Sequence, residues 1–378
     1  MPNAKQILKK VWKAVKNPLL AFVLALIAGG ILIAISGYNP FWVYYQVFAL
    51  AFSSAKNIAS VFAQATPLMF TGVAYAIAAK CGLVNLGLEG QMLSGAMMSA
   101  LLGAYIKGLP IYIHLPIAVL GGAAAGAAIG ALTAWLKNRF GAREIITTVM
   151  LNEIVALLVS YLCNDPFRAE GSIWGMTETV QSTAVIGKLM KNTQLTYAIF
   201  LAIALAIILE IIMKKSVVGY EMQVIGKNLR AAKTAGIKVS RVFLFSFALS
   251  GALAGLCGAA MILGVNFKFI DGFSDSYGWS GISVAALAAY DPFFSVISAL
   301  LFGVLKAGAM ILYRTSNVPK EFVSVIQAFV VVFVAAPNMI EAICSFDWAI
   351  APSRSSIVAP SGKSSSSNSP SVHSMTTV

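Results

Sequence analysis

Charged side chains are scarce in this sequence. Asp, Glu, Lys and Arg make up only 11% of its 378 residues, whereas 59% of the residues are hydrophobic. A soluble globular domain usually carries about 25% charged residues. The shortage of charge therefore excludes a chain that folds in water alone, and it indicates a protein embedded in a membrane.

Residues that build redox, metal or catalytic centres are also few. The sequence contains no GxxxxGK[ST] phosphate loop, no HExxH pair and no GxSxG nucleophile elbow. Its cysteines lie in or beside apolar stretches without a CxxC spacing, so we read them as small hydrophobic residues. We predict no disulfide framework, metal site, cofactor or catalytic residue. The residues considered are Cys81, Cys163, Cys257, Cys344, His114 and His373.

What the sequence has instead is a series of long apolar runs. About 20 apolar residues suffice for one helix to cross a bilayer, and continuous runs of this kind favour helices over a barrel. We therefore predict an all-α, polytopic transmembrane helical bundle with nine or ten membrane segments. The segments are Ala21–Ile35, Ile58–Ala79, Met92–Ile106, Pro116–Leu136, Ile145–Leu162, Leu195–Met213, Val242–Val265, Phe293–Leu312 and Phe322–Ala336, with Ile282–Tyr290 as a short half-helix.

Positive charge is distributed unevenly between the connections. As far as Phe269, sixteen Lys and Arg residues fall on one side of the predicted bundle, in 5–16, 80, 137–143 and 214–241, against six on the other side. Cytoplasmic loops carry such an excess of basic residues. We therefore predict a multi-pass membrane protein with a cytoplasmic N-terminus, and we attribute the net charge of +13 to topology rather than to nucleic-acid binding.

Composition divides the chain into a basic N-terminus (1–18), a membrane domain (19–345) and a Ser-rich tail (353–378). The apolar region after residue 18 is longer than the roughly 7–15 residues of a signal peptide, so we predict an uncleaved first helix. The tail's low hydrophobicity predicts disorder, and we assign it no function. Residues 214–241 form a basic cytoplasmic loop, which is either a docking surface or a plain connector.

Glycines recur at a spacing of four in two of the predicted helices. This spacing lets membrane helices approach closely, so we expect a compact bundle. It is common among polytopic proteins and therefore supports the class of protein rather than a substrate. The glycines are Gly122, Gly126, Gly130, Gly251 and Gly255.

A polar, glycine-containing stretch, NLGLEGQ, separates two apolar segments. Asn85, Glu89 and Gln91 supply its polar groups. Charged and non-helical segments at membrane depth are tolerated where protein shields them or where they line water. We predict an irregular or re-entrant element at a solute pathway or a subunit contact. For Glu89 alone, a helix N-cap at the cytoplasmic interface is an equal alternative.

Three further polar residues stand inside apolar segments. Asn152 and Glu153 are expected to face the bundle, either as interhelical hydrogen-bonding groups or in the solute path. Lys306 needs a partner or water, and it is either a pathway residue or a snorkelling side chain near a helix end. Glu210 stands one turn before Lys214, and we expect an ion pair between them at the cytoplasmic interface.

Four stretches in order resemble the permease subunits of bacterial ABC importers for branched-chain amino acids, simple sugars and nucleosides. NLGLEGQMLSG resembles the signature N-I-G-x-E-G-Q, and TTVMLN resembles the T-I-M-L-N stretch of the nucleoside branch. GYEMQVIGKNLRAAKTAG is similar to the cytoplasmic loop pattern of the family, and GWSGISVAA to a block before a short helix. They begin at Asn85, Thr147, Gly219 and Gly278, and the resemblance covers roughly 57–336.

The resemblance implies an ATP-driven importer in the bacterial inner (plasma) membrane that takes up nucleosides through the bundle. Its partners would be an ABC ATPase in a separate chain, a second permease subunit and a lipid-anchored solute-binding protein. The loop 214–241 would form a coupling helix that docks in a groove of the ATPase. The residues assigned to coupling are Gly219, Gly226, Asn228, Ala231, Ala232 and Gly236, and those assigned to the substrate pathway are Asn85, Glu89, Gln91, Asn152, Glu153 and Lys306.

Two departures from the family pattern leave alternatives open. Asp291 and Pro292 replace an expected basic turn, which leaves the topology after Gly278 undecided, and Glu153 replaces a frequent aromatic residue. A simple-sugar permease is the alternative within the family. An ion-coupled secondary transporter would need a coupling site of its own, such as paired carboxylates in inverted repeats, and a membrane enzyme would need a catalytic constellation.

Overall fold

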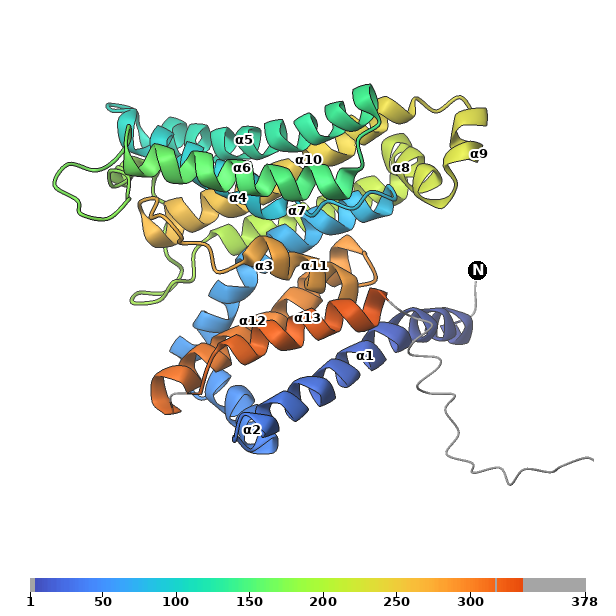
Figure 1. The fold of residues 1–378 in the computed structure, drawn as a ribbon, viewed down its shortest axis with the longest axis horizontal. Coiled ribbons are helices and arrows are strands. Elements are labelled where there is room, and N and C mark those ends of the chain that lie inside the picture. The colour runs from blue at the N-terminus through green and yellow to red at the C-terminus, as the bar shows by residue number, and fades with distance from the viewer. Residues whose placement is uncertain (1–3, 317, 336–378) are drawn as a thin grey trace, which may run out of the picture.

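The computed structural model describes residues 4–316 and 318–335, and within them the secondary structure is helical, with two isolated β-bridges and no strand. The helices lie side by side in an elongated bundle (Figure 1). The elements are α1 (Ala4–Ile35), α2 (Pro40–Ala51), α3 (Ala55–Lys80), α4 (Leu88–Tyr105), α5 (Ile111–Phe140), α6 (Glu144–Asn164), η1 (Ser182–Ala184), α7 (Ala198–Lys215), α8 (Val217–Lys227), α9 (Leu229–Thr234), α10 (Val239–Met261), η2 (Ile262–Asn266, a π-helix), α11 (Tyr277–Leu287), α12 (Pro292–Ser316) and α13 (Glu321–Ala335).

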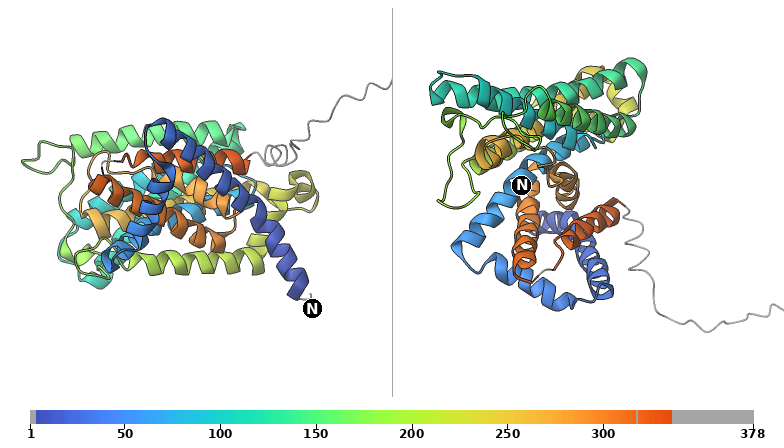
Figure 2. Two further views of the ribbon diagram at one scale, coloured as in Figure 1. Left: turned by 90° about the horizontal axis from the view of Figure 1, so that it is seen from below. Right: turned by 60° about the vertical axis from the view of Figure 1, so that its left-hand side comes forward.

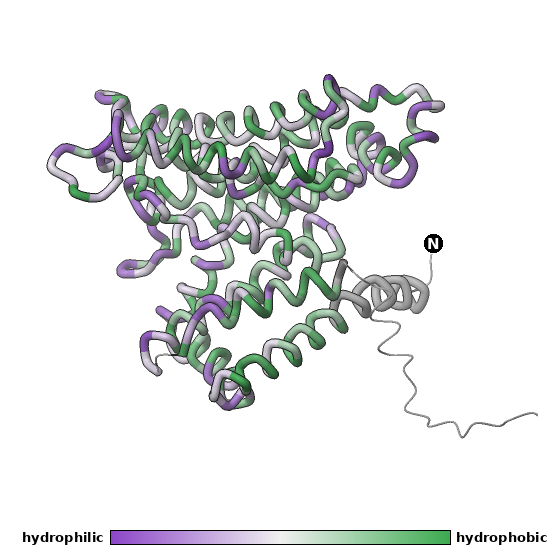
Figure 3. The backbone as a smooth tube through the Cα atoms, in the orientation of Figure 1, coloured by the Kyte–Doolittle hydropathy of each residue, from purple (hydrophilic) through white to green (hydrophobic). Residues whose placement is uncertain are grey.

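Five helices in the described ranges are individually long and apolar enough to cross a membrane: α3, α5, α6, α10 together with η2, and α12. The bent pair of α1 and α2 provides a sixth candidate. Hydrophilic residues gather in the loops at the two ends of the bundle, while apolar residues follow the helices between them (Figure 3). These observations confirm an all-α polytopic bundle, and the count of nine or ten segments stays a prediction.

Helix α3 lies between two groups of helices. It contacts α10 on one side and α12 on the other, and the short helix α11 also packs against it. The first group contains α4, α5, α6 and α10, and the second contains α1, α2, α12 and α13; the two groups diverge away from α3 (Figures 1 and 2). The central window of α3 is 89% buried, so it forms the common core of both groups.

Helix α2 was not among the predicted segments. Its first turn is well specified, because Asn39 Oδ1 accepts hydrogen bonds from the N–H groups of Phe41 and Trp42 and Pro40 occupies the first helical position. The axis turns by 115° between α1 and α2. At 12 residues, α2 is too short to stand out as a membrane-length apolar run.

The structure resolves the order of elements after Gly278. The predicted half-helix is confirmed as the short α11, which begins at Tyr277 rather than at Ile282. Asp291 Oδ1 then accepts hydrogen bonds from the backbone N–H groups of Phe293 and Phe294, so the Asp–Pro pair begins α12. The end of α13 lies near α1, at the end of the bundle that also holds α8 and α9 (Figure 1). The predicted tail, 353–378, lies outside the described residues.

The predicted glycine packing is confirmed between α5 and α10. A Cβ atom added at Gly126 would collide with backbone atoms of Gly251 and Gly255, and one at Gly130 would collide with the carbonyl of Phe247. Gly95 of α4 meets Gly255 in the same way. Backbones at this separation gain dispersion energy along their length, which is how small residues hold membrane helices together.

We predict that Gly126→Ala destabilises the protein and that Gly121→Ala, on the same helix, does not. The added methyl group at 126 meets backbone that moves only if α5 and α10 separate, and such overpacking costs about 1–3 kcal/mol. At 121 it meets the flexible end of Leu102 instead. The measurement is the apparent melting temperature in detergent. Equal melting temperatures for the two variants would contradict the close packing.

Candidate functional site

Three of the predicted pathway residues form one buried hydrogen-bond cluster. Asn85 Nδ2 donates to Gln91 Oε1 at 3.0 Å and to Ser250 Oγ of α10 at 2.9 Å, and Ser250 Oγ donates to the carbonyl of Ala74 in α3. Asn152 of α6 accepts from the N–H of Gly90 at 2.7 Å and donates to the carbonyl of Leu86 at 2.7 Å. The irregular stretch before α4 is thereby tied to three helices.

The partners of this cluster all belong to the chain itself, and its side chains are buried. Asn85 and Gln91 are fully buried and Asn152 is 4% exposed. These contacts support the interhelical hydrogen-bonding alternative for Asn152. Interhelical hydrogen bonds average about 0.6 kcal/mol in a membrane. The cluster therefore fixes the geometry of the irregular stretch before α4 more than it adds to the stability of the protein.

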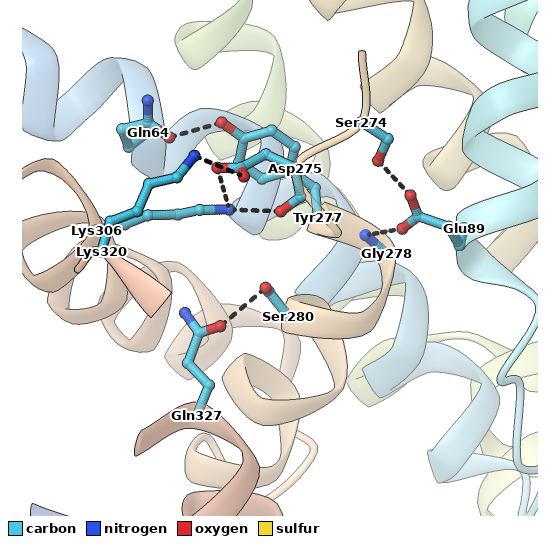
Figure 4. A network of polar contacts seen from close by, with 10 residues as sticks. All are labelled: Gln64, Glu89, Ser274, Asp275, Tyr277, Gly278, Ser280, Lys306, Lys320 and Gln327. Carbon is cyan, nitrogen blue, oxygen red and sulfur yellow. Dashed lines mark hydrogen bonds and ion pairs between the residues drawn. The ribbon is translucent and has the colours of Figure 1, made fainter. Parts of the chain in front are cut away.

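Glu89 points away from that cluster, toward the beginning of α11. Its Oε2 accepts the backbone N–H of Gly278 at 2.8 Å, and its Oε1 accepts the hydroxyl of Ser274 (Figure 4). The first N–H groups of a helix lack partners within the helix and carry a partial positive charge, which a carboxylate stabilises. Glu89 therefore caps the N-terminal end of α11, which is distant in sequence, rather than the N-terminal end of its own helix, α4.

Lys306 has a carboxylate partner on the other side of α11. Its Nζ lies 3.1 Å from Asp275 Oδ2 and donates to the Asp275 carbonyl at 2.8 Å. The same ammonium group stands 3.8 Å from the ring centroid of Tyr277, a cation–π distance. Lys320 approaches Asp275 Oδ1 at 3.8 Å. A paired, largely buried Lys306 is not the snorkelling side chain of the alternative expectation.

Two glutamines extend this network, which joins α3, α4, α11, α12 and α13 (Figure 4). Gln64 Oε1 accepts the hydroxyl of Tyr277 at 2.6 Å, and Gln327 Oε1 accepts the hydroxyl of Ser280 at 2.9 Å. Sequence reasoning missed Asp275, Tyr277, Lys320 and Gln327. Gln327 was detectable as a polar interruption of the apolar run from Phe322, whereas the partners of Lys306 are set by tertiary packing.

A cavity of about 150 Å³ opens beside this network between α12 and α13. Asp275, Lys306, Lys320, Glu321 and Gln327 contribute to its walls. Lys306, a predicted pathway residue, thus lies at a polar cavity together with its partner Asp275. The predicted pathway residues Asn85, Gln91 and Asn152 lie in the separate cluster.

Glu153 lies apart from both clusters. It is exposed on α6, next to the buried Asn152, so the expectation that both residues face the bundle is wrong for Glu153. Neighbouring residues of a helix point about 100° apart, and they do not share a face. The expected pair of Glu210 and Lys214 is confirmed as a one-turn ion pair at the end of α7.

The loop 214–241 folds into α8 and α9, which lie at one end of the bundle (Figure 1). Ser216 accepts the N–H of Gly219 at the start of α8, and Asn228 accepts the N–H groups of Arg230 and Ala231 at the start of α9. Both helices thus begin with side-chain caps. Gly236 follows α9 with φ +78°, a conformation that favours glycine.

Three small residues of this loop, Gly219, Gly226 and Ala232, pack within the chain. Gly219 packs on the backbone of Met213 in α7, and Gly226 packs on the end of α3 at Lys80. Ala232 is fully buried in the core of the chain, whereas Ala231 is exposed. Ala232, one of the residues assigned to coupling, is therefore not accessible to a partner, and Ala231 is the alanine of α9 that remains accessible.

We predict that Lys306→Met destabilises the bundle and that adding Asp275→Asn restores part of the loss. The single change leaves a carboxylate without its main partner, which costs about 3–5 kcal/mol in a fully buried pair. Asp275 is 38% exposed and Lys320 remains near, so we expect about 1–3 kcal/mol. Thermal unfolding in detergent measures it. A double variant no more stable than the single one would contradict the pairing.

Comparison with known proteins places this geometry in a family. The chain is 31% identical to the nucleoside ABC transporter permease protein NupB of Lactococcus lactis, over 86% of this chain and 91% of that protein. It is 33% identical to the guanosine ABC transporter permease protein NupP of Bacillus subtilis, over 84% and 92%. It is also 29% identical to the glucose ABC transporter permease protein TsgB13 of Haloferax volcanii, over 85% and 87%.

The family match agrees with these relatives and covers most of the helical bundle. Residues 57–335 match the family described as branched-chain amino acid transport system, permease component. The matched region contains the irregular stretch before α4, the α8–α9 loop and the network around α11. The chain therefore belongs to this family of ABC-transporter permeases and is a multi-pass membrane protein.

Proposed function

We propose that this chain is the permease subunit of an ATP-driven importer and that its substrate is a nucleoside. The observation that carries the proposal is the similarity, over more than four fifths of the chain, to two permeases named for nucleosides and for guanosine. A permease of this kind provides the path for the solute, and hydrolysis of ATP takes place in a separate ATPase chain.

The α8–α9 loop is the proposed contact with that ATPase. Arg230, Ala231 and Lys233 are exposed on α9, and the apolar side chain of Leu229 is 41% exposed at its start. Arg is enriched at protein interfaces, and Leu229 adds apolar surface beside Arg230. The buried Ala232 holds the base of the loop in place, so the accessible side chains are presented on a fixed support.

Movement of this loop has a direct route into the bundle. Gly226 packs against the end of α3 and against Gly82, which precedes the irregular stretch. That stretch leads to Glu89, whose carboxylate holds the start of α11. We propose that displacement of α8 by the ATPase is passed through these packed segments to α11 and alters access to the polar cavity.

The proposed orientation places α8, α9 and the N-terminus in the cytoplasm. The basic residues of 80, 137–143 and 214–241 surround the ends of α3, α5 and α7, where α8 and α9 lie, whereas the loop between α6 and α7 lies at the opposite end (Figure 1). An excess of basic residues marks the cytoplasmic side. The opposite face would receive a lipid-anchored solute-binding protein, and a second permease subunit would complete the path.

A sugar permease is the second candidate, favoured by the similarity to a glucose permease. The test is uptake of radiolabelled uridine, guanosine, ribose, glucose and leucine by cells that lack this chain, with and without depletion of ATP. Loss of ATP-dependent nucleoside uptake alone is the expected result. Loss of ribose or glucose uptake alone would show that the substrate is a sugar. Uptake that requires this chain but does not fall when ATP is depleted would exclude the ABC mechanism.

We predict that Ala231→Glu abolishes uptake while the protein still accumulates in the membrane, and that Ala232→Glu prevents accumulation. The first change places a bulky acid on the exposed side of α9, whereas the second buries a carboxylate without a partner. Uptake, membrane content and ATPase activity of the assembled transporter are measured together, with Lys107→Glu on the opposite side as the control. Normal uptake by the Ala231→Glu variant would refute the coupling assignment.

A further inference from the structure

Gln327, a buried residue on the wall of the cavity between α12 and α13, carries an amide donor without a partner in the part of the chain that the structure describes. Gln327 is 5% exposed, and its Nε2 has no hydrogen-bond partner among the described residues. Its Oε1 is held by the hydroxyl of Ser280, which fixes the direction of the amide (Figure 4). Buried polar groups in folded proteins nearly always have partners, so a donor held at a cavity wall points to a group that binds from outside the chain.

The charges on the cavity wall balance. Lys306 and Lys320 supply two positive charges, and Asp275 and Glu321 supply two negative charges. A lining without net charge gives no advantage to a phosphate or carboxylate ligand, nor to a cation. It offers both donors and acceptors, which suits a hydroxyl group because each hydroxyl donates one hydrogen bond and accepts others.

The remaining lining of the cavity offers no surface on which a nucleobase could stack. Met310, Val323 and Ser324 complete the wall, and no aromatic ring is part of it. Nucleobases are commonly bound by stacking on aromatic side chains, and this surface gives a base nothing to stack on.

We propose that this cavity binds the vicinal hydroxyl groups of an uncharged sugar, with Gln327 Nε2 donating to one hydroxyl oxygen and the carboxylates accepting from the hydroxyl protons. The assignment rests on the proposed function, under which the sugar is the ribose of a nucleoside. A free simple sugar presents the same chemistry, and the experiment separates these two sources.

The test compares ligands with and without the hydroxyl groups in cells that carry the complete transporter. KM for uptake is measured with uridine and with 2′,3′-dideoxyuridine for the wild type and for Gln327→Met, which retains the length of the side chain but loses the donor. We expect KM for uridine to rise about tenfold, the effect of about 1.4 kcal/mol, and KM for dideoxyuridine to stay unchanged. Ser280→Ala is the matched control, because it removes the hydrogen bond to Oε1 and leaves Nε2 in place.

Two outcomes overturn the assignment. An equal rise of KM for both ligands would show that Gln327 only positions α13, and an unchanged KM for both would show that the amide does not contact the solute. If Gln327→Met fails to accumulate in the membrane, Gln327→Glu provides the second variant, since it keeps an acceptor for Ser280 and removes the donor while adding one negative charge, whose effect falls on both ligands alike.

Comparing the different ligands distinguishes failure of the cavity assignment from failure of the proposed nucleoside function. Normal nucleoside uptake without a hydroxyl-dependent effect of Gln327→Met would refute the cavity assignment alone. If the wild type instead takes up ribose or glucose and no nucleoside, and Gln327→Met weakens uptake of the sugar but not of its deoxy analogue, the cavity assignment stands and the nucleoside function fails.

Discussion

The arrangement of the bundle depends on the close packing of α3. Gly72 of α3 meets Val284 of α11, and Gly281 of α11 meets Thr71 of α3. In the second group, Gly303 of α12 packs on Ala65 of α3. Helices within a membrane gain little from burying apolar surface against each other, so the close approach of small residues carries the association. Since the two groups meet chiefly through α3, this helix determines how they are placed.

Polar contacts position the short helix α11 within that frame. Its 11 residues are too few to cross the membrane, so its depth is not determined by hydrophobic length. Glu89 holds its beginning from the α4 side, while Lys306 holds the preceding Asp275 from the α12 side. The beginning of α11 is thus held from both groups by hydrogen bonds and an ion pair, in addition to its packing on α3.

Hydropathy predicted the fold well, because each long helix is an apolar run whose length matches a bilayer. The glycine spacing likewise predicted which faces pack, since a repeat of four keeps small residues on one side of a helix. The predictions failed in two situations: where the outcome depended on the direction in which a side chain points, and where a helix was shorter than a membrane span. Glu153 and Ala232 point away from the predicted surfaces, and α2 has too few residues to register as a span.

The candidate site could be predicted only in part. A lysine in an apolar run signals that a partner exists, and Lys306 was found in this way. Its partner Asp275 lies outside the apolar runs, in the chain that leads into α11, and only the folded structure brings the two together. Asn85, Gln91 and Asn152 were found by the same signal, but their hydrogen bonds are satisfied within the chain. Polar residues at membrane depth therefore located the irregular segments. They did not distinguish residues that hold the fold together from residues that line the cavity.

The glycine seam also bears on how the protein is made. Helix α5 is synthesised well before α10, and the interval from Gly126 to Gly251 corresponds to roughly ten seconds of translation at about 5–20 residues per second. During that time the seam of α5 faces lipid or other helices. A row of glycines places no polar side chain in the lipid, so the seam stays open to its partner until α10 arrives. Assembly of this half of the protein is thus completed only after the α8–α9 loop has been synthesised.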